Sequence, residues 1–353
     1  MSINLRIHIV GDLKSDWYPK NAIEMFKKYS EFEFVDSPDK AHIIWIFSYS
    51  MNLNYLKLNT WKNLIANRIG LKKSIRRSNQ LIICSFHHLY KPKEEQYLQR
   101  VINADNLSDV IHFFSYRNAV ENQGYFKNPI FISPYWIETN VFTPLSTETR
   151  QSLKSHFNIP KNKIVVGSFQ RDTENDLLSP KLEKGPDIFC DVMENLDSDR
   201  FFVLLAGPRR HYVANRLNSA NIPFIQLGKV PHTEMNKLYN TLDYYLVTSR
   251  IEGGPQAILE SMASKTSIYS TPVGISDLLD NDVVIDNSIE IAKALNHNYP
   301  NVKLNHIQTA EKYSAPKIIR SYENIFGELY DAKIKQPTTF HNHTKGIEWL
   351  SID

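Results

Sequence analysis

Several features are scarce or missing in this sequence of 353 residues. Its only two cysteines, Cys84 and Cys190, lie in apolar stretches far apart, which favours two buried thiols in a reducing compartment over a disulfide. No apolar run approaches the ~20 residues that a membrane-spanning helix needs. Met1 is followed almost at once by a strand pattern, so we expect no signal peptide and a cytoplasmic protein.

The net charge is also small, and one common nucleotide-binding motif is missing. The 41 basic and 38 acidic residues leave a net charge of only +3, so general nucleic-acid binding is not expected. There is no G-x-G-x-x-G string, so the nicotinamide dinucleotide fingerprint is absent. With 42% hydrophobic and 22% charged residues, the composition is that of an ordinary globular protein. The length suits two domains of roughly 150–180 residues each.

Short apolar runs alternate with helical patterns along the chain. Strands are predicted at 5–10, 31–35, 42–47, 80–86, 110–115, 129–133, 163–171, 201–205, 223–227, 243–247 and 267–270, and helices at 21–29 and 315–330. This alternation predicts an α/β fold with parallel sheets and helices on both faces. Ligands of such sheets bind beyond the carboxyl ends of the strands.

The most informative stretch, residues 249–263, passes from a strand through a Gly-Gly loop into a helix. Pro255 suits the first helical position, where its missing N–H is not needed. Gly253 and Gly254 permit a sharp turn and leave backbone N–H groups uncovered. A glycine-rich turn that opens a helix predicts an anion site, because free amides and the positive end of the helix dipole point the same way.

Two glutamates flank this turn. Glu260 lies five residues after Pro255, about 7.5 Å along the helix axis. Its carboxylate could therefore accept hydrogen bonds from a ribose while the helix start holds a diphosphate. Glu252, before the helix, is expected on the other side of the phosphates, where a donor sugar would lie.

Glu252 and Glu260 are separated by seven residues and followed by Ser-Met-Ala and then by Thr271-Pro-Val-Gly274. This string resembles the E-x7-E signature of the retaining GT-B glycosyltransferases of family 4. The resemblance implies two Rossmann-like domains facing each other across a cleft. It also implies transfer of a sugar, with retention of configuration, from a UDP- or GDP-sugar to a glycan, lipid-linked or small-molecule acceptor. No cofactor and no metal are expected.

The same resemblance assigns roles to other residues. Arg171 and Lys184 would neutralise the donor diphosphate, and His87 or His88 would lie at the reaction centre with Glu252. Besides Glu260, Arg171 and Lys184, the implied donor contacts are Gly253, Gly254, Pro255, Gln256 and Val230, the last through the backbone beside the base. Gly11 and Asp12, after the first strand, would lie on the acceptor side.

Domain boundaries follow from the same pattern. We expect an acceptor-binding domain over residues 1–145 and a nucleotide-sugar-binding domain over 160–315. Residues 316–353 would form a helix that crosses back to the first domain, followed by a polar tail. Glu138 stands where the family usually has an aspartate. Asp197-Ser-Asp199 matches a metal-binding D-x-D string, but its place between a helix and a strand favours a turn.

Residues 55–78 contain seven lysines and arginines, no acidic residue, and apolar residues at helical spacing. Such a helix can bind an anionic membrane surface, which would make the protein peripheral at the inner membrane. It can equally pack its apolar stripe on its own sheet, with its charges in water. The sequence leaves both alternatives open.

Two other functions remain open at this stage. The fold could support different chemistry, such as that of a sugar-nucleotide epimerase or a phosphorylase. The chain could also bind a sugar nucleotide without turning it over, although the intact set of Glu252, Glu260 and Lys184 argues against this.

Overall fold

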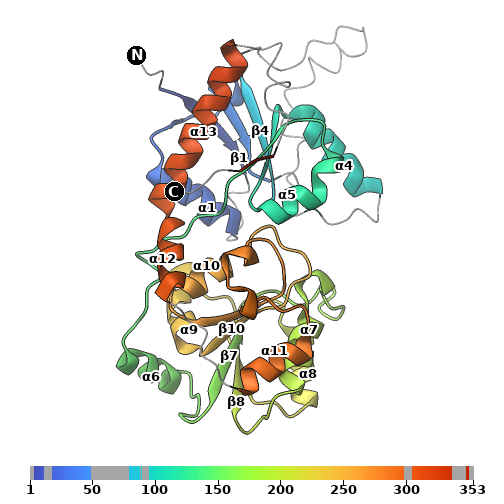
Figure 1. Ribbon diagram of the computed structural model, residues 1–353, viewed down its shortest axis with the longest axis vertical. Coiled ribbons are helices and arrows are strands. Elements are labelled where there is room, and N and C mark those ends of the chain that lie inside the picture. The colour runs from blue at the N-terminus through green and yellow to red at the C-terminus, as the bar shows by residue number, and fades with distance from the viewer. Residues whose placement is uncertain are drawn as a thin grey trace. The chain divides into compact units, whose positions relative to one another are not determined.

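A computed structural model describes residues 4–11, 18–48, 79–87, 89, 95–297, 304–335 and 347–349. The chain forms two compact units, one made of residues 1–134 and 315–353 and the other of residues 135–314. Each unit is built on a parallel β-sheet with helices packed on it (Figure 1).

The sheet of the first unit has seven strands in the order β12-β6-β5-β4-β3-β1-β2, all paired in parallel. The strands are β1 (Arg6–Val10), β2 (Glu33–Phe34), β3 (Ile43–Ile46), β4 (Leu81–Phe86), β5 (Val110–Phe113), β6 (Ile130–Ile132) and β12 (Ile347–Trp349). The strand expected at 31–35 is reduced to the two residues of β2, an edge strand paired only with β1. The polar tail contributes β12, which pairs with β6 and was not expected as a strand.

The middle strands of this sheet are buried throughout, because helices cover both of its faces. One face carries α4 (Glu95–Leu107) and α5 (Tyr116–Asn122), whose apolar residues join the core formed with β4 and β5. The other carries α1 (Tyr18–Tyr29) and α13 (Ala315–Lys335), which lie side by side in Figure 1. Phe26 of α1 and Phe326 of α13 pack on Trp45 of β3, with ring centroids 4.8 and 5.2 Å away.

A buried polar network fixes α13 to the sheet. Trp45 Nε1 donates to Ser85 Oγ (2.8 Å), and Ser85 Oγ lies 2.7 Å from His112 Nδ1. His112 Nε2 donates to the Ser133 carbonyl (3.0 Å), which also accepts from the Tyr322 hydroxyl of α13 (2.8 Å). The ring of His112 is therefore neutral, with its proton on Nε2. Burial lowers the pKa of His112 to about 3.

The sheet of the second unit has five parallel strands in the order β11-β10-β7-β8-β9. They are β7 (Ile164–Ser168), β8 (Phe201–Leu205), β9 (Phe224–Gln226), β10 (Tyr244–Val247) and β11 (Ser267–Ser270). The helices are α6 (Thr147–His156), α7 (Pro186–Glu194), α8 (His211–Ser219), α9 (Met235–Thr241), α10 (Gln256–Ala263), α11 (Ser288–Asn296) and α12 (Leu304–Lys312). The chain builds outward from β7 to β9 and then returns to the other side of β7 with β10, so the order of strands reverses between β7 and β10.

Candidate functional site

The reversal between β7 and β10 is where an open parallel sheet binds its ligands. The two strands pair through Val166 and Gly167 with Tyr244 and Tyr245, so both carboxyl ends lie at the same edge. Two loops start there, one from β7 to α7 and the other from β10 to α10. Between them they carry Arg171, Lys184, Glu252 and the Gly-Gly turn.

Gly185 brings the two loops into direct contact. Its φ is +58°, in the left-handed region that favours glycine. A Cβ atom built on it would lie 1.7 Å from the carbonyl oxygen of Thr248, at the end of β10. No side chain fits in that space, so the Lys-Gly-Pro string has a steric reason for its glycine.

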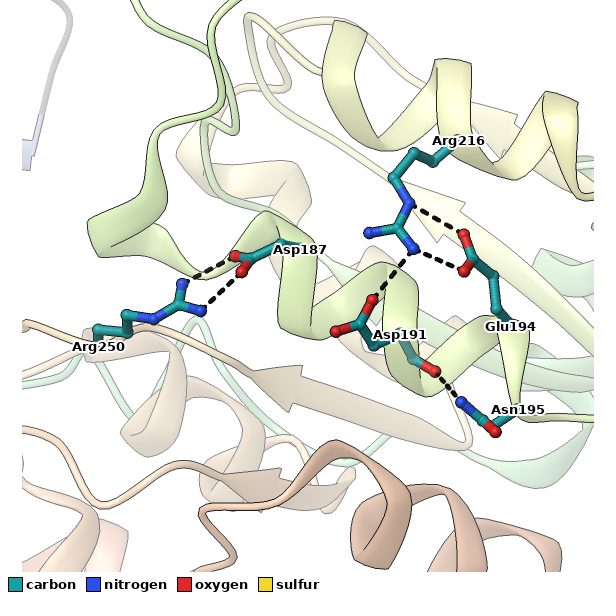
Figure 2. A network of polar contacts seen from close by, with 6 residues as sticks. All are labelled: Asp187, Asp191, Glu194, Asn195, Arg216 and Arg250. Atoms are coloured by element: carbon teal, nitrogen blue, oxygen red, sulfur yellow. Dashed lines mark hydrogen bonds and ion pairs between the residues drawn. The ribbon is translucent and has the colours of Figure 1, made fainter.

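Hydrogen bonds fasten the loops on either side of this contact. The backbone amides of Arg250 and Ile251 both donate to the carbonyl of Glu183, at 2.9 and 3.2 Å. The Arg250 guanidinium forms a two-pronged ion pair with Asp187 in the first turn of α7, at 2.8 and 2.6 Å (Figure 2). Burial alone would raise the pKa of Asp187, but the hydrogen bonds and charge of Arg250 lower it.

The far end of α7 is held in the same way. Arg216 of α8 donates two hydrogen bonds to Glu194 and one to Asp191 (Figure 2). Ion pairs therefore anchor α7 at its start to the loop after β10 and at its end to α8. Lys184 lies just before α7, the helix that these ion pairs hold.

Lys184 and Glu252, which were expected to act on different parts of a donor, are directly paired. Lys184 Nζ donates to Glu252 Oε1 at 2.6 Å, and both side chains are largely buried. Ser249 Oγ lies 2.9 Å from the same carboxylate oxygen and 3.1 Å from Gln170 Oε1, so its one proton serves either acceptor. Gln170 Nε2 donates to the Lys184 carbonyl at 2.6 Å. The ammonium thus has a fixed direction and two further N–H groups for other acceptors.

Arg171 follows Gln170 in the loop after β7 and is partly buried. Burial and the nearby charge of Arg209 both lower the pKa of Arg171, while Glu174 and Glu183 oppose the shift. Arg171 in the loop after β7 and Arg209 in the loop after β8 repel each other, and an anion between them would relieve that repulsion.

Glu260 lies in the middle of α10 and is only 8% exposed. Its Oε2 accepts a hydrogen bond from the hydroxyl of Tyr239 at 2.6 Å, and its Oε1 faces His232 Nε2 at 3.8 Å. Burial raises the pKa of Glu260, although the charge of His232 and the Tyr239 hydrogen bond act in the opposite direction.

The Gly-Gly-Pro turn differs from expectation in one respect. Helix α10 begins at Gln256, with Pro255 as its N-cap in an extended conformation (ψ 108°), so the prediction that Pro255 is the first helical residue was wrong by one position. Neither Gly253 nor Gly254 has a positive φ. Gly254 is instead required by close packing, because a Cβ there would lie 2.7 Å from the ring of Tyr135. Gln256 Nε2 donates to the Trp136 carbonyl at 3.1 Å.

The remaining predicted residues are placed as follows. Val230 is half-buried after β9, and Gly11 directly follows β1. His87 follows β4, donates from Nε2 to the Phe47 carbonyl at 2.7 Å, and stacks on Phe114. Asp12, His88 and the basic stretch 55–78 lie outside the described residues.

Asp197-Ser-Asp199 forms the turn that its position predicted. The amide of Asp199 donates to Asp197 Oδ1 at 2.9 Å, and the amide of Arg200 donates to the Asp197 carbonyl. Within the described parts of the chain, no group of three or more His, Cys, Asp or Glu side chains is arranged to hold a metal ion.

Four residues of this site had no role in the sequence analysis. Gln170 and Ser249 complete the Lys184–Glu252 network, and Tyr239 and His232 surround Glu260. Only Ser249 carried a local signal, its place directly after a buried strand and before the loop.

Comparisons of the sequence with known proteins match one part of the chain to a family. Residues 177–300, which include Lys184, Glu252 and Glu260, match the family model described as "Glycosyl transferases group 1". A comparison with curated proteins finds no significant sequence match.

Solved structures establish the fold. HepE of Anabaena, solved in complex with UDP and glucose, is 13% identical with a TM-score of 0.69, over 92% of this chain and all of its own. A glycosyltransferase of Rickettsia africae is 15% identical with a TM-score of 0.65, over 94% and 98% of the two chains. Sucrose-phosphate synthase of Thermosynechococcus elongatus is 15% identical with a TM-score of 0.63, over 90% and 81%. The predicted α/β GT-B fold, with two Rossmann-like parallel sheets, is thereby confirmed.

None of the helices within the described ranges is long and apolar enough to cross a membrane.

Proposed function

We propose that this protein is a glycosyltransferase that moves a sugar from a nucleotide diphosphate sugar to an acceptor, with retention of anomeric configuration. The observation that carries the proposal is the Lys184–Glu252 pair at the strand reversal of the second unit, followed along the chain by the buried Glu260. All three residues fall in the segment that matches the group 1 glycosyltransferases.

Each charged group fits one part of a donor of this kind. A departing nucleoside diphosphate gains negative charge as the glycosidic bond breaks, and cations positioned in advance stabilise it. Lys184 supplies such a cation, and its pairing with Glu252 keeps the ammonium in place before any donor binds. Arg171 supplies a second, in a loop where an anion relieves its repulsion by Arg209.

Glu260 fits the ribose. Tyr239 holds the carboxylate from the buried side, and among the described residues no donor bonds to Oε1. A ribose hydroxyl can therefore donate to this oxygen. The solved complexes of HepE contain UDP or UDP-glucose, which makes UDP-sugars the first donors to test.

In the proposed reaction the bond between the sugar C1 and the diphosphate oxygen breaks, and the acceptor oxygen bonds to C1 on the same face. The leaving diphosphate takes the acceptor proton, so no second carboxylate at the spacing of a retaining glycosidase is needed. Glu252, paired with Lys184, would lie beside the donor sugar. His87 or His88 would contact the donor sugar. A glycan or lipid-linked acceptor, with Gly11 on the acceptor side, completes the proposal.

The test has a binding arm and a turnover arm. Calorimetry with UDP and GDP should show Glu260→Ala and Lys184→Ala binding more weakly by about 1.5–3 kcal/mol, as expected when a hydrogen bond to a charged group is lost. Glu290→Ala and Lys293→Ala are matched controls, because both side chains are exposed on α11. Unchanged affinity in the site variants would refute the assignment.

For the turnover arm, UDP- and GDP-sugars are screened for release of free UDP or GDP, with and without acceptors. The proposal expects slow donor hydrolysis that Glu252→Gln reduces. Tight binding without any turnover would instead indicate a sugar-nucleotide-binding protein.

A further inference from the structure

His232 is placed against Glu260 in a way that neither the strand pattern nor the glutamate spacing requires. It begins the short 3-10 turn His232–Glu234 after β9, and its ring packs edge-on against Phe142 with centroids 5.2 Å apart. Its Nε2 lies 3.8 Å from Glu260 Oε1, too far for a direct hydrogen bond.

The distance suits a third polar atom between the two. An oxygen about 2.8 Å from both Nε2 and Oε1 fits between them, with an angle close to a right angle at that oxygen. A hydroxyl matches both neighbours, since it can accept from an imidazole N–H while it donates to a carboxylate.

Access to Glu260 is one-sided. Tyr239 is 1% exposed and occupies Oε2, so nothing reaches the carboxylate from that direction. The side chain of His232 is 26% exposed and lies next to Oε1. A ligand that approaches Glu260 from solvent therefore meets Oε1 and His232 together.

We propose that His232 is a ribose-binding residue, and that its Nε2 and Glu260 Oε1 together hold one hydroxyl of the ribose of a nucleoside diphosphate. This inference rests on the proposed function, which supplies the nucleotide. It goes further in assigning a second protein partner to one ribose hydroxyl. Because His232 Nε2 and Glu260 Oε1 are 3.8 Å apart and converge on one point, they would hold one hydroxyl of the ribose and not both.

The experiment compares UDP with 2′-deoxy-UDP and 3′-deoxy-UDP by calorimetry, and repeats the series with GDP analogues. The variant is His232→Phe, which keeps a planar ring against Phe142 but removes the N–H group. His156→Phe is the matched control, because His156 is an exposed histidine at the end of α6 in the same unit.

For the wild type we expect one deoxy analogue to bind at least about tenfold more weakly than the parent nucleotide, and the other to lose much less. In His232→Phe the parent nucleotide should bind more weakly, and the penalty for the sensitive deoxy analogue should shrink to about threefold or less. His156→Phe should behave as the wild type.

Two outcomes would overturn the inference alone. One is a wild type that binds UDP or GDP but treats both deoxy analogues like the parent. The other is a His232→Phe variant that keeps the full wild-type discrimination. In both cases the proposed function stands, because a diphosphate still binds. A wild type that binds no nucleoside diphosphate overturns both.

Discussion

The contact at Gly185 leads to a prediction that can be worked out from the structure. Replacing Gly185 by alanine places a Cβ atom where the Thr248 carbonyl oxygen now lies, 1.7 Å away. Real Cβ atoms stay at least 3.0 Å from such an atom, so the two loops must separate by about 1.3 Å (3.0 minus 1.7). Alanine is also strained at the φ of +58°.

These two effects, the close contact and the backbone strain, determine how much stability the substitution removes. The left-handed backbone costs alanine roughly 1–2 kcal/mol. Separating the loops stretches the two amide bonds from Arg250 and Ile251 to Glu183, each contributing about 0.5–1.5 kcal/mol. We therefore expect Gly185→Ala to lower the free energy of unfolding of the second unit by about 2–5 kcal/mol, which lowers its Tm on the order of 10 °C.

Thermal melting followed by circular dichroism measures this directly. The control is Gly228→Ala, since a Cβ at Gly228 meets nothing within 4 Å and its φ is not positive. That variant should be as stable as the wild type or slightly more stable, because alanine restricts the unfolded chain. A Gly185→Ala protein that melts within roughly 2 °C of the wild type would refute the steric argument.

Three further predictions follow from other parts of the molecule. Burial lowers the pKa of His112 to about 3, so its contribution to stability is complete above the unfolded value of about 6.5 and is lost as the pH falls. Between pH 6.5 and 4.5 the loss should be about 2.3 kcal/mol, and urea titrations of His112→Gln should lack this part of the pH dependence. Activity should survive EDTA because cationic side chains neutralise the diphosphate; activity lost in EDTA and restored by Mn²⁺ would contradict this. If the stretch 55–78 binds anionic membranes, the protein should co-sediment with anionic but not neutral vesicles, and changing Lys72, Lys73, Arg76 and Arg77 to glutamate should abolish this; equal, salt-independent partitioning of both proteins would favour a soluble acceptor.

The sequence predicted those parts of the fold and site that depend on local patterns. Apolar runs and their alternation with helices located the strands, and the spacing of Glu252 and Glu260 placed them on either side of a loop–helix junction. Lys184 was assigned through the resemblance to the glycosyltransferase family, and a glycine and a proline follow it. The structure adds a steric reason for that glycine.

Contacts between distant segments could not be predicted from local sequence patterns. The pairing of Lys184 with Glu252 joins residues 68 positions apart, and that of His232 with Glu260 depends on how the loop after β9 packs against α10. The close packing at Gly254 could not be predicted either, because its neighbour is the ring of Tyr135, more than a hundred residues earlier. Local patterns predict backbone conformation, whereas the contacts of these residues depend on how distant segments pack together.

The first unit is assembled from both ends of the described chain, and this bears on the order of folding. Its sheet is complete up to β6 by residue 132, but α13 comes only after the whole second unit. Until α13 arrives, Trp45 and Phe26 lack the cover of Phe326, and the Ser133 carbonyl lacks the Tyr322 hydroxyl. During synthesis, the second unit can therefore finish folding while the first still exposes an aromatic face, a stage at which chaperone binding or aggregation competes with completion.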